Sequence, residues 1–167
     1  HSNTAGARIA DALDQEELAA ALSGCEAAIH CISGDPATIV GAIDPLIFAA
    51  NAAGLKRIVY LSSASVHGQS PEPDTDESSP LRGDQEIAYN NAKVEAERQL
   101  RAEASPEIVI LRPGIVYGPD CRWTNEFTQA LKNGSACLVN RGEGICNACH
   151  VDNLVEASRL SLITPQA

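Results

Sequence analysis

The sequence contains no methionine, and only 4% of its 167 residues are aromatic. Because it opens with His1 and has no Met at position 1, we interpret it as a segment of a longer protein. Positive charge is also scarce: 12 Lys and Arg stand against 22 Asp and Glu, which gives a net charge of −10. The basic residues form no block. Nucleic-acid binding depends on clustered positive charge, so we expect no nucleic-acid partner.

Long apolar runs are missing as well. No run approaches the roughly 20 residues that a membrane helix needs, so we expect no membrane association. The first residues show neither the basic leader nor the apolar stretch of a signal peptide, and we therefore expect a cytoplasmic location. The 44% of apolar residues is nevertheless enough to build a core, which argues against a disordered chain.

Six cysteines suggest either disulfides or a zinc site, but their spacing supports neither strongly. Only Cys146 and Cys149 lie close together, and a structural zinc site needs a second ligand pair. His150 follows directly, so a cluster of three ligands is conceivable. We favour small, partly buried thiols on short strands and predict no metal site. A reducing compartment would keep these thiols free.

Segments typical of helices alternate with segments typical of strands. We expect a strand end at 8–11 and strands at 27–32, 56–63, 108–111 and 136–139. We expect helices at 15–23, 36–53, 84–103, 125–132 and 152–163, with Pro45 kinking or splitting the second. Residues 69–83 are rich in Pro, Ser and acidic residues and predict a loop. The alternation predicts an α/β fold with a parallel sheet, whose ligands bind at the carboxyl ends of the strands.

The segment Tyr89-Asn90-Asn91-Ala92-Lys93 can carry chemistry. On a helix, residues four apart share one face at about 6 Å. An ammonium beside a phenol lowers the pKa of the phenol, which can then exchange a proton with a hydroxyl or carbonyl group. The spacing alone is weak, because such pairs are common on solvated helix faces. A serine at the end of the 56–63 strand adds a hydrogen-bond donor for the same substrate oxygen.

Four segments in order strengthen this hypothesis: 62–68 (SSASVHG), 89–93 (YNNAK), 111–119 (LRPGIVYGP) and 150–154 (HVDNL). With them, residues 8–162 resemble the extended short-chain dehydrogenases/reductases, the NAD-dependent epimerase/dehydratase family. The resemblance implies a Rossmann-like, doubly wound parallel sheet and NAD or NADP as cofactor. It implies an incomplete NAD(P)-binding domain at 1–118, a substrate-binding region at 119–150 and a helix returning to the core at 151–167.

The resemblance also assigns roles to single residues. It implies that Tyr89 is the general acid/base and that Lys93 lowers its pKa and binds the nicotinamide ribose. Ser63 corresponds to the donor to the substrate oxygen, and Ser65 is the alternative and a substrate contact. The further cofactor contacts that it implies are Asp11 at the adenine, Ile32, Ser33 and Pro113. For Asp11, a plain helix or turn cap is an almost equal interpretation.

The sequence departs from the family pattern at its beginning. None of its 12 glycines form the Gly-x-x-Gly-x-x-Gly turn that receives the cofactor pyrophosphate. We therefore interpret the chain as lacking the first βαβ portion, and predict that alone it binds nicotinamide cofactor poorly or not at all. Ala64-Ser65 stands where dehydratases of the family carry Asp-Glu, which disfavours dehydration.

The expected function is that of an epimerase or dehydrogenase-type enzyme acting on a hydroxyl or keto group, with a nucleotide sugar as the expected substrate. Arg122 and Arg141 lie in the expected substrate region and could hold a diphosphate, although charged tips of surface loops fit equally well. A ketone or sterol-type reductase is the second hypothesis, and a non-catalytic nucleotide-binding relative is the third. Relatives dimerise through helices corresponding to 36–53 and 84–104, which implies a homodimer.

Overall fold

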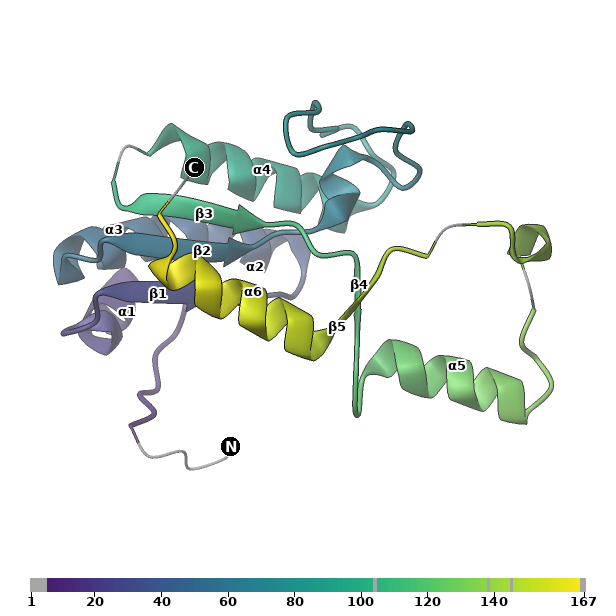
Figure 1. Cartoon of the computed structure of the whole chain (residues 1–167). Coiled ribbons are helices and arrows are strands. Elements are labelled where there is room, and N and C mark those ends of the chain that lie inside the picture. The colour runs from purple at the N-terminus through teal and green to yellow at the C-terminus, as the bar shows by residue number, and fades with distance from the viewer. Residues whose placement is uncertain (1–5, 104, 138, 145, 166–167) are drawn as a thin grey trace. The chain divides into compact units, whose positions relative to one another are not determined.

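The structure, a computed structural model, describes residues 6–103, 105–137, 139–144 and 146–165. The chain divides into two compact units, residues 1–112 and 113–167 (Figure 1). The boundary follows Arg112, at the end of the segment that leaves the last strand of the first unit.

The first unit is built on a parallel sheet with the strand order β1-β2-β3. The strands are β1 (Ala27–His30), β2 (Arg57–Leu61) and β3 (Glu107–Leu111). In the register of the sheet, His30 lies beside Tyr60 and Leu61 lies beside Leu111. The carboxyl ends of all three strands therefore share one edge, which is where parallel sheets place their ligands.

Helices α1 (Gln15–Leu22), α2 (Pro36–Gly41), α3 (Ile43–Ala53) and α4 (Ala88–Ala102) follow the predicted segments. Asp14 caps α1 and Asp35 caps α2 through their carboxylates, as short acidic side chains do at helix starts. The predicted split of the 36–53 helix is confirmed. It falls at Ala42, because Pro45 then lies in the first turn of α3, where its missing N–H costs no hydrogen bond.

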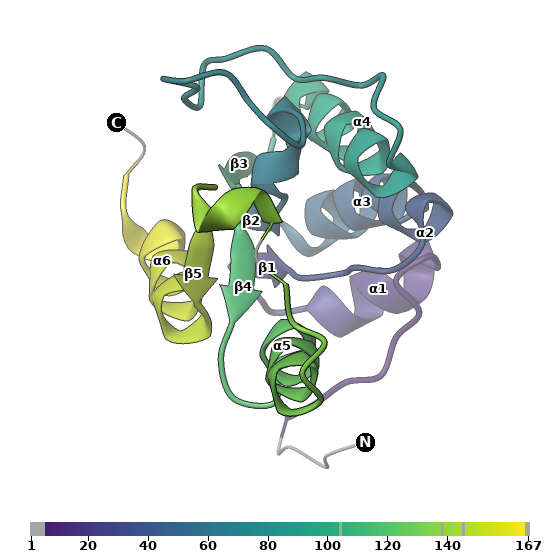
Figure 2. The ribbon, with the colours of Figure 1, turned by 90° about the vertical axis from the view of Figure 1, so that its right-hand side faces the viewer.

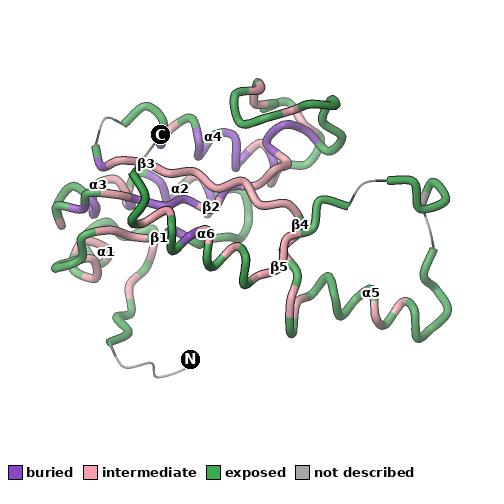
Figure 3. The backbone as a smooth tube through the Cα atoms, in the orientation of Figure 1, coloured by how far each residue is buried: buried purple, intermediate pink, exposed green. Residues whose placement is uncertain are grey.

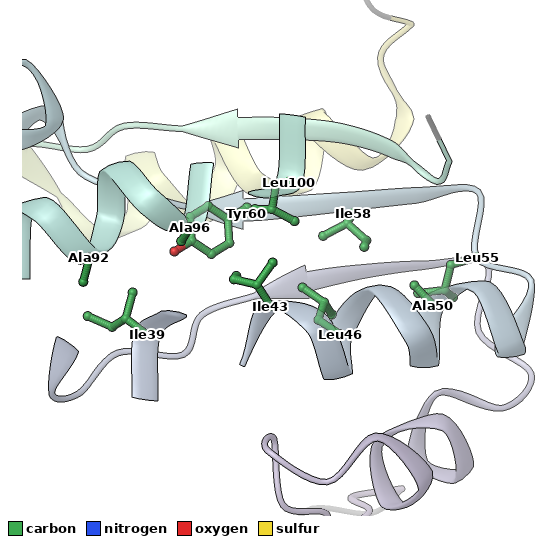
Figure 4. Packing of buried hydrophobic residues seen from close by; sticks show 10 residues of the cluster. All are labelled: Ile39, Ile43, Leu46, Ala50, Leu55, Ile58, Tyr60, Ala92, Ala96 and Leu100. Carbon is green, nitrogen blue, oxygen red and sulfur yellow. The ribbon is translucent and has the colours of Figure 1, made fainter. Parts of the chain in front are cut away.

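One apolar cluster holds the helices to the sheet (Figure 4). Side chains from α2, α3 and α4 pack against Ile58 and Tyr60 of β2, which point to the same face of the sheet. The buried members are Ile39, Ile43, Leu46, Ala50, Leu55, Ile58, Tyr60, Ala92, Ala96 and Leu100. Truncating a large member such as Leu100 to alanine would cost about 2–5 kcal/mol of stability. This cluster fixes α4, which carries Tyr89 and Lys93, against the sheet.

The stretch Pro36–Ala53 is long and apolar enough to cross a membrane by length and composition alone. This corrects the expectation that no apolar run approaches membrane length. The stretch is broken into α2 and α3, and Ile39, Ile43 and Leu46 belong to the apolar cluster. Core helices commonly pass the same test, so it is weak support for a membrane span.

The second unit contains a two-stranded parallel sheet of β4 (Ile115–Tyr117) and β5 (Ala148–His150) (Figure 2). It also contains the helices α5 (Arg122–Lys132) and α6 (Val151–Ile163) and the short 3₁₀ helix η2 (Val139–Gly142). A side chain at Gly114 would overlap the backbone carbonyl oxygen of Asn147, so the close approach of the two strands requires glycine there. Among the described residues of this unit only Ser158 is buried (Figure 3).

Two predicted strands are wrong. Residues 8–11 form no strand: the side chain of Ile9 is 98% exposed, and the Arg8 guanidinium instead donates to three carbonyls at the end of α1, which it caps. The described part of 136–139 forms no strand either. Val139 opens η2, in which Asn140 and Arg141 have left-handed backbone angles (φ 48° and 56°), and these end a strand.

Other element boundaries also differ from prediction. Helix α4 begins at Ala88 rather than 84, because the Asn91 side chain binds both backbone groups of Gln85 and holds that residue outside the helix. Helix α5 begins at Arg122, three residues before its predicted start. Strands β4 and β5 were not predicted, because each has only three residues and three residues show no recognisable alternation.

Candidate functional site

The predicted serine pair follows the carboxyl end of β2. Ser63 caps the 3₁₀ helix η1 (Ala64–His67), and its Oγ accepts a hydrogen bond from the backbone N–H of Ser65 at 3.2 Å. The two hydroxyls also share a hydrogen bond of 2.8 Å between their Oγ atoms. Both serines are half-buried. One of the two serine hydroxyls can thus orient the other, and the oriented hydroxyl can donate a hydrogen bond to a substrate oxygen.

A set of amide side chains ties this serine turn to the start of α4. Gln85 Nε2 donates to the carbonyl oxygen of Ser65 at 2.8 Å, and Gln85 Oε1 accepts from Asn90 Nδ2 at 2.8 Å. Asn91 closes the set, because its Oδ1 accepts from the Gln85 N–H and its Nδ2 donates to the Gln85 carbonyl. Asn90 and Asn91 directly follow Tyr89, so these bonds hold the serine turn close to the tyrosine helix. The sequence reasoning missed this amide set.

Lys93 lies one helical turn after Tyr89 on α4, as predicted. Its side chain is 2% exposed, and its Nζ donates to the carbonyl oxygen of Leu61, the last residue of β2, at 2.8 Å. The Lys93 amine lies 5.9 Å from the centroid of the Tyr89 ring. Tyr89 is half-buried and packs against the apolar cluster of the first unit. The structure therefore brings the amine, the phenol ring and the end of β2 together.

The protonation of this pair differs from expectation. Burial lowers the pKa of Lys93 to about 8, and Cys31 and Glu97 partly oppose this effect. Burial also raises the pKa of Tyr89, whereas the sequence predicted that Lys93 would lower it. Burial determines the shift at Tyr89, and the hydrogen bonds of the Lys93 amine go to the Leu61 carbonyl and the Tyr60 hydroxyl rather than to the Tyr89 hydroxyl. Tyr89 is thus a protonated phenol near neutral pH in this structure.

A buried ion pair fixes the middle of α4 against the end of β3. Glu97 is fully buried, and its carboxylate accepts two hydrogen bonds from Arg112, at 3.0 Å from Nε and 2.7 Å from Nη2. The same guanidinium contacts His67 Nε2 at 3.0 Å and donates to the carbonyl of Glu77. The sequence analysis did not identify this pair. A glutamate at a position that the helical pattern places among buried residues was the signal that could have indicated it. The pair positions α4 and the 69–83 loop relative to the sheet.

The other predicted cofactor residues of the first unit lie after β1 and before α1. Ile32 and Ser33 follow β1 at the edge where β2 leads to Ser63; Ile32 is half-buried and Ser33 is exposed. Asp11 Oδ1 accepts from the N–H of Leu13 at 2.9 Å, so its carboxylate caps the turn before α1. This contact is the turn cap that the sequence left open, and an adenine contact stays a prediction.

Three predicted residues belong to the second unit. Pro113 opens it, directly before the β4 region. Arg122 is exposed and pairs with Glu126 at 2.6 Å, and Arg141 is exposed in η2. In the part of the chain that the structure describes, no three His, Cys, Asp or Glu side chains are grouped so that they could hold a metal ion. Ser63, Ser65, Tyr89 and Lys93 therefore lie within the first unit, whereas Arg122 and Arg141 lie in the second.

Two of the sequence motifs meet inside the second unit. Tyr117 of the LRPGIVYGP segment pairs in register with His150, which opens the HVDNL segment. Their rings meet edge to face with centroids 5.2 Å apart. A side chain at Gly118 would lie 2.6 Å from Val151 Cγ1, so glycine is needed for this approach as well. Contacts inside the second unit thus explain the tyrosine and glycine of the LRPGIVYGP segment and the histidine of the HVDNL segment.

Comparison with known proteins gives a consistent result. The model of the NAD dependent epimerase/dehydratase family matches residues 2–167. A 3-diazoavenalumate denitrifying reductase from a Streptomyces species is 30% identical, over 90% of this chain and 56% of its own length. A 2-alkyl-3-oxoalkanoate reductase from Stenotrophomonas maltophilia is 28% identical, over 90% of this chain and 50% of its own length.

Solved structures agree in fold. The dTDP-glucose 4,6-dehydratase from Streptomyces venezuelae, crystallised with NAD, superposes with a TM-score of 0.80 at 24% identity and covers 94% of this chain. The match extends over 54% of that protein. The dehydratase and the two reductases are thus each matched over about half of their own length, although about nine tenths of this chain is covered. The α/β fold with a Rossmann-like parallel sheet is thus confirmed. The chain belongs to the NAD-dependent epimerase/dehydratase family.

Proposed function

We propose that this chain carries the proton-transfer half of the active site of an NAD(P)-dependent epimerase or dehydrogenase-type enzyme that acts on a hydroxyl or keto group. The observation that carries the proposal is the buried Lys93 amine, bonded at 2.8 Å to the carbonyl at the end of β2 and one turn from Tyr89. A buried lysine with a lowered pKa beside a tyrosine at a ligand-binding edge is typical of a catalytic site. Ser63 follows two residues after Leu61.

The roles follow from the chemistry of each group. NAD or NADP, when bound, accepts or supplies the hydride. Tyr89, held as a phenol by burial, gives its proton to the substrate oxygen in the reducing direction and takes one back in the oxidising direction. Approach of the Lys93 ammonium would favour the phenolate and so assist the oxidising direction. Ser63 donates a hydrogen bond to the same substrate oxygen.

The buried Lys93 amine at the carboxyl end of β2 and the half-buried Tyr89 one turn before it support binding of the nicotinamide end of such a cofactor. Lys93 and Tyr89 would hold the ribose and ring there, with Ile32 and Ser33 along the edge of the sheet, Pro113 beside the nicotinamide, and Asp11 at the adenine. The sequence has no glycine turn for the pyrophosphate, so the 167 residues contain no such binding site for this part of the cofactor.

We further propose a nucleotide sugar as the substrate, bound in the 119–150 region, with Arg122 and Arg141 at its diphosphate. The planar fork of arginine suits phosphate oxygens. A ketone or sterol-type reductase is the second candidate. It is supported by the two reductases that match 90% of the chain, and Ala64-Ser65 in place of an acidic pair disfavours dehydration.

The test replaces Tyr89 with phenylalanine in the protein translated from its full reading frame. Loss of the general acid/base should lower kcat by about 10²- to 10⁴-fold while the Kd for NAD(P)H stays unchanged. Tyr117→Phe is the matched control, because Tyr117 lies in β4 of the second unit. Turnover of UDP- and dTDP-sugars against ketones decides between the two candidates. Full activity of Tyr89→Phe would refute both candidate functions. If the unsubstituted protein binds the cofactor but turns over none of these substrates, a non-catalytic relative is favoured.

Two further proposals concern the assembly and its location. We propose a homodimer through α2, α3 and α4, and α3 offers the exposed Phe48 for such a contact. Light scattering of Phe48→Asp against the unchanged protein tests this, since the charged variant should be a monomer. A cytoplasmic location likewise stays a prediction.

A further inference from the structure

Lys93 has different neighbours from those that its spacing to Tyr89 predicts. Its Nζ lies 4.9 Å from the centroid of the Tyr60 ring, against 5.9 Å for the Tyr89 ring. It also lies 3.4 Å from the hydroxyl oxygen of Tyr60, which accepts a hydrogen bond from it. Together with the bond to the Leu61 carbonyl, these contacts place the amine against β2.

The nearest carboxylate along the helix does not neutralise this amine directly. Glu97 lies four residues after Lys93, a spacing at which ion pairs form on helices. Both of its oxygens are instead hydrogen-bonded to Arg112. Among the described residues, no carboxylate forms an ion pair with Lys93. The direct contacts of the ammonium are therefore the Leu61 carbonyl and the oxygen and ring face of Tyr60, while Cys31 and Glu97 favour its charged form without a hydrogen bond to it.

Tyr60 is itself fixed by the neighbouring strand. It is fully buried, and its ring stacks on that of His30 with centroids 5.4 Å apart and an angle of 23° between the planes. The two residues are partners in the register of β1 and β2. Neither ring nitrogen of His30 has a hydrogen-bond partner among the described residues, and a neutral ring there does not repel the Lys93 ammonium. The stacked His30 ring thus supports the Tyr60 ring from the neighbouring strand.

We propose that Tyr60 is a positioning residue that holds the Lys93 amine at the carboxyl end of β2, one turn from Tyr89. The role rests on the proposed function, in which Lys93 acts on Tyr89 and the cofactor ribose. The hydroxyl oxygen of Tyr60 stabilises the charged amine, and its ring limits how far the amine can move from the strand. A residue that only filled the core could be phenylalanine without consequence for Lys93.

Lysine NMR tests this on the 167-residue chain. The sequence has only three lysines, and Lys56 and Lys132 are exposed, so they serve as internal references. Titration of the ¹³Cε signals gives each pKa separately. In Tyr60→Phe, loss of the acceptor should lower the pKa of Lys93 by about half a unit or more, about a threefold fall in proton affinity. Tyr89→Phe is the matched control and should shift it less.

An unchanged Lys93 titration in Tyr60→Phe, or a larger shift in Tyr89→Phe, would overturn the proposal. The unsubstituted chain provides a second readout should the Tyr60 variant fail to fold. The Lys93 Hε protons should show stronger nuclear Overhauser effects to the Tyr60 ring than to the Tyr89 ring, and the reverse order would also overturn it. Neither readout involves turnover, so its failure is distinguishable from failure of the proposed function, which is decided by the activity of Tyr89→Phe.

Discussion

Mild acid should destabilise the first unit through His30. Burial, and secondly the charge of Lys93, lower the pKa of His30 from 6.5 to about 4. Between these two values the unfolded chain binds a proton at His30 and the folded chain does not. Stability therefore falls as the pH falls through this window, and the loss is complete below the folded pKa.

The size of the effect follows from the two pKa values. At about pH 7 neither state binds much proton at His30, and the loss of stability is only about 0.2 kcal/mol. At about pH 5 the unfolded histidine is almost fully protonated and the folded one is not, which costs about 2 kcal/mol. That is a large fraction of the roughly 5–15 kcal/mol by which small domains are stable.

His30→Phe is the matched variant, because it keeps an aromatic ring stacked on Tyr60 and removes the titrating group. Urea unfolding followed by far-UV circular dichroism at both pH values gives the comparison. The only tryptophan, Trp123, reports on the second unit and is not the probe of choice. The unsubstituted chain should lose about 2 kcal/mol more than His30→Phe on acidification. Equal losses, or a His30 imidazole that titrates near its ordinary pKa by NMR, would refute the reasoning.

Three other perturbations have defined outcomes. Glu97→Gln leaves the buried Arg112 guanidinium without its charge partner and should cost about 3–5 kcal/mol in urea unfolding, with much of the loss restored by adding Arg112→Met. Gly114→Ala should open the β4–β5 pairing and speed hydrogen exchange at the Ile115 N–H, whereas Gly144→Ala, which meets open space, should not. NADH fluorescence titrated with the 167-residue chain should show weak binding or none, because the chain has no glycine turn; micromolar affinity would contradict this.

Local signals in the sequence predicted much of the first unit. Apolar residues at helical spacing predicted the helix at 15–23, and Asp14, a short acidic residue directly before it, caps α1 in the structure. Runs of β-branched residues such as Ile58-Val59 need two covered faces, which predicts a buried parallel strand. These elements depend on neighbours in the sequence, so the sequence alone reveals them.

Features that depend on distant partners were not predictable in the same way. Asn91 is an ordinary helix residue by its pattern, and only the fold shows that it binds Gln85 and delays the start of α4. Likewise, Glu97 and Arg112 are 15 residues apart and lie on different elements, so no periodicity connects them. The predicted strand at 136–139 is wrong, and its last residue, Val139, opens η2, in which Asn140 and Arg141 have left-handed backbone angles.

The protonation of the tyrosine–lysine pair is the clearest example of a property that the sequence motif did not predict. The spacing of Tyr89 and Lys93 fixes only that they share a helix face, and from it one expects a phenol with a lowered pKa. Whether the amine reaches the phenol depends on what else can accept its hydrogen bonds. Here the end of β2 offers the Leu61 carbonyl and the Tyr60 oxygen, and the amine goes there. The four-residue spacing therefore does not fix the direction of the shift, because burial of the Tyr89 phenol raises its pKa while the amine binds to the adjacent strand.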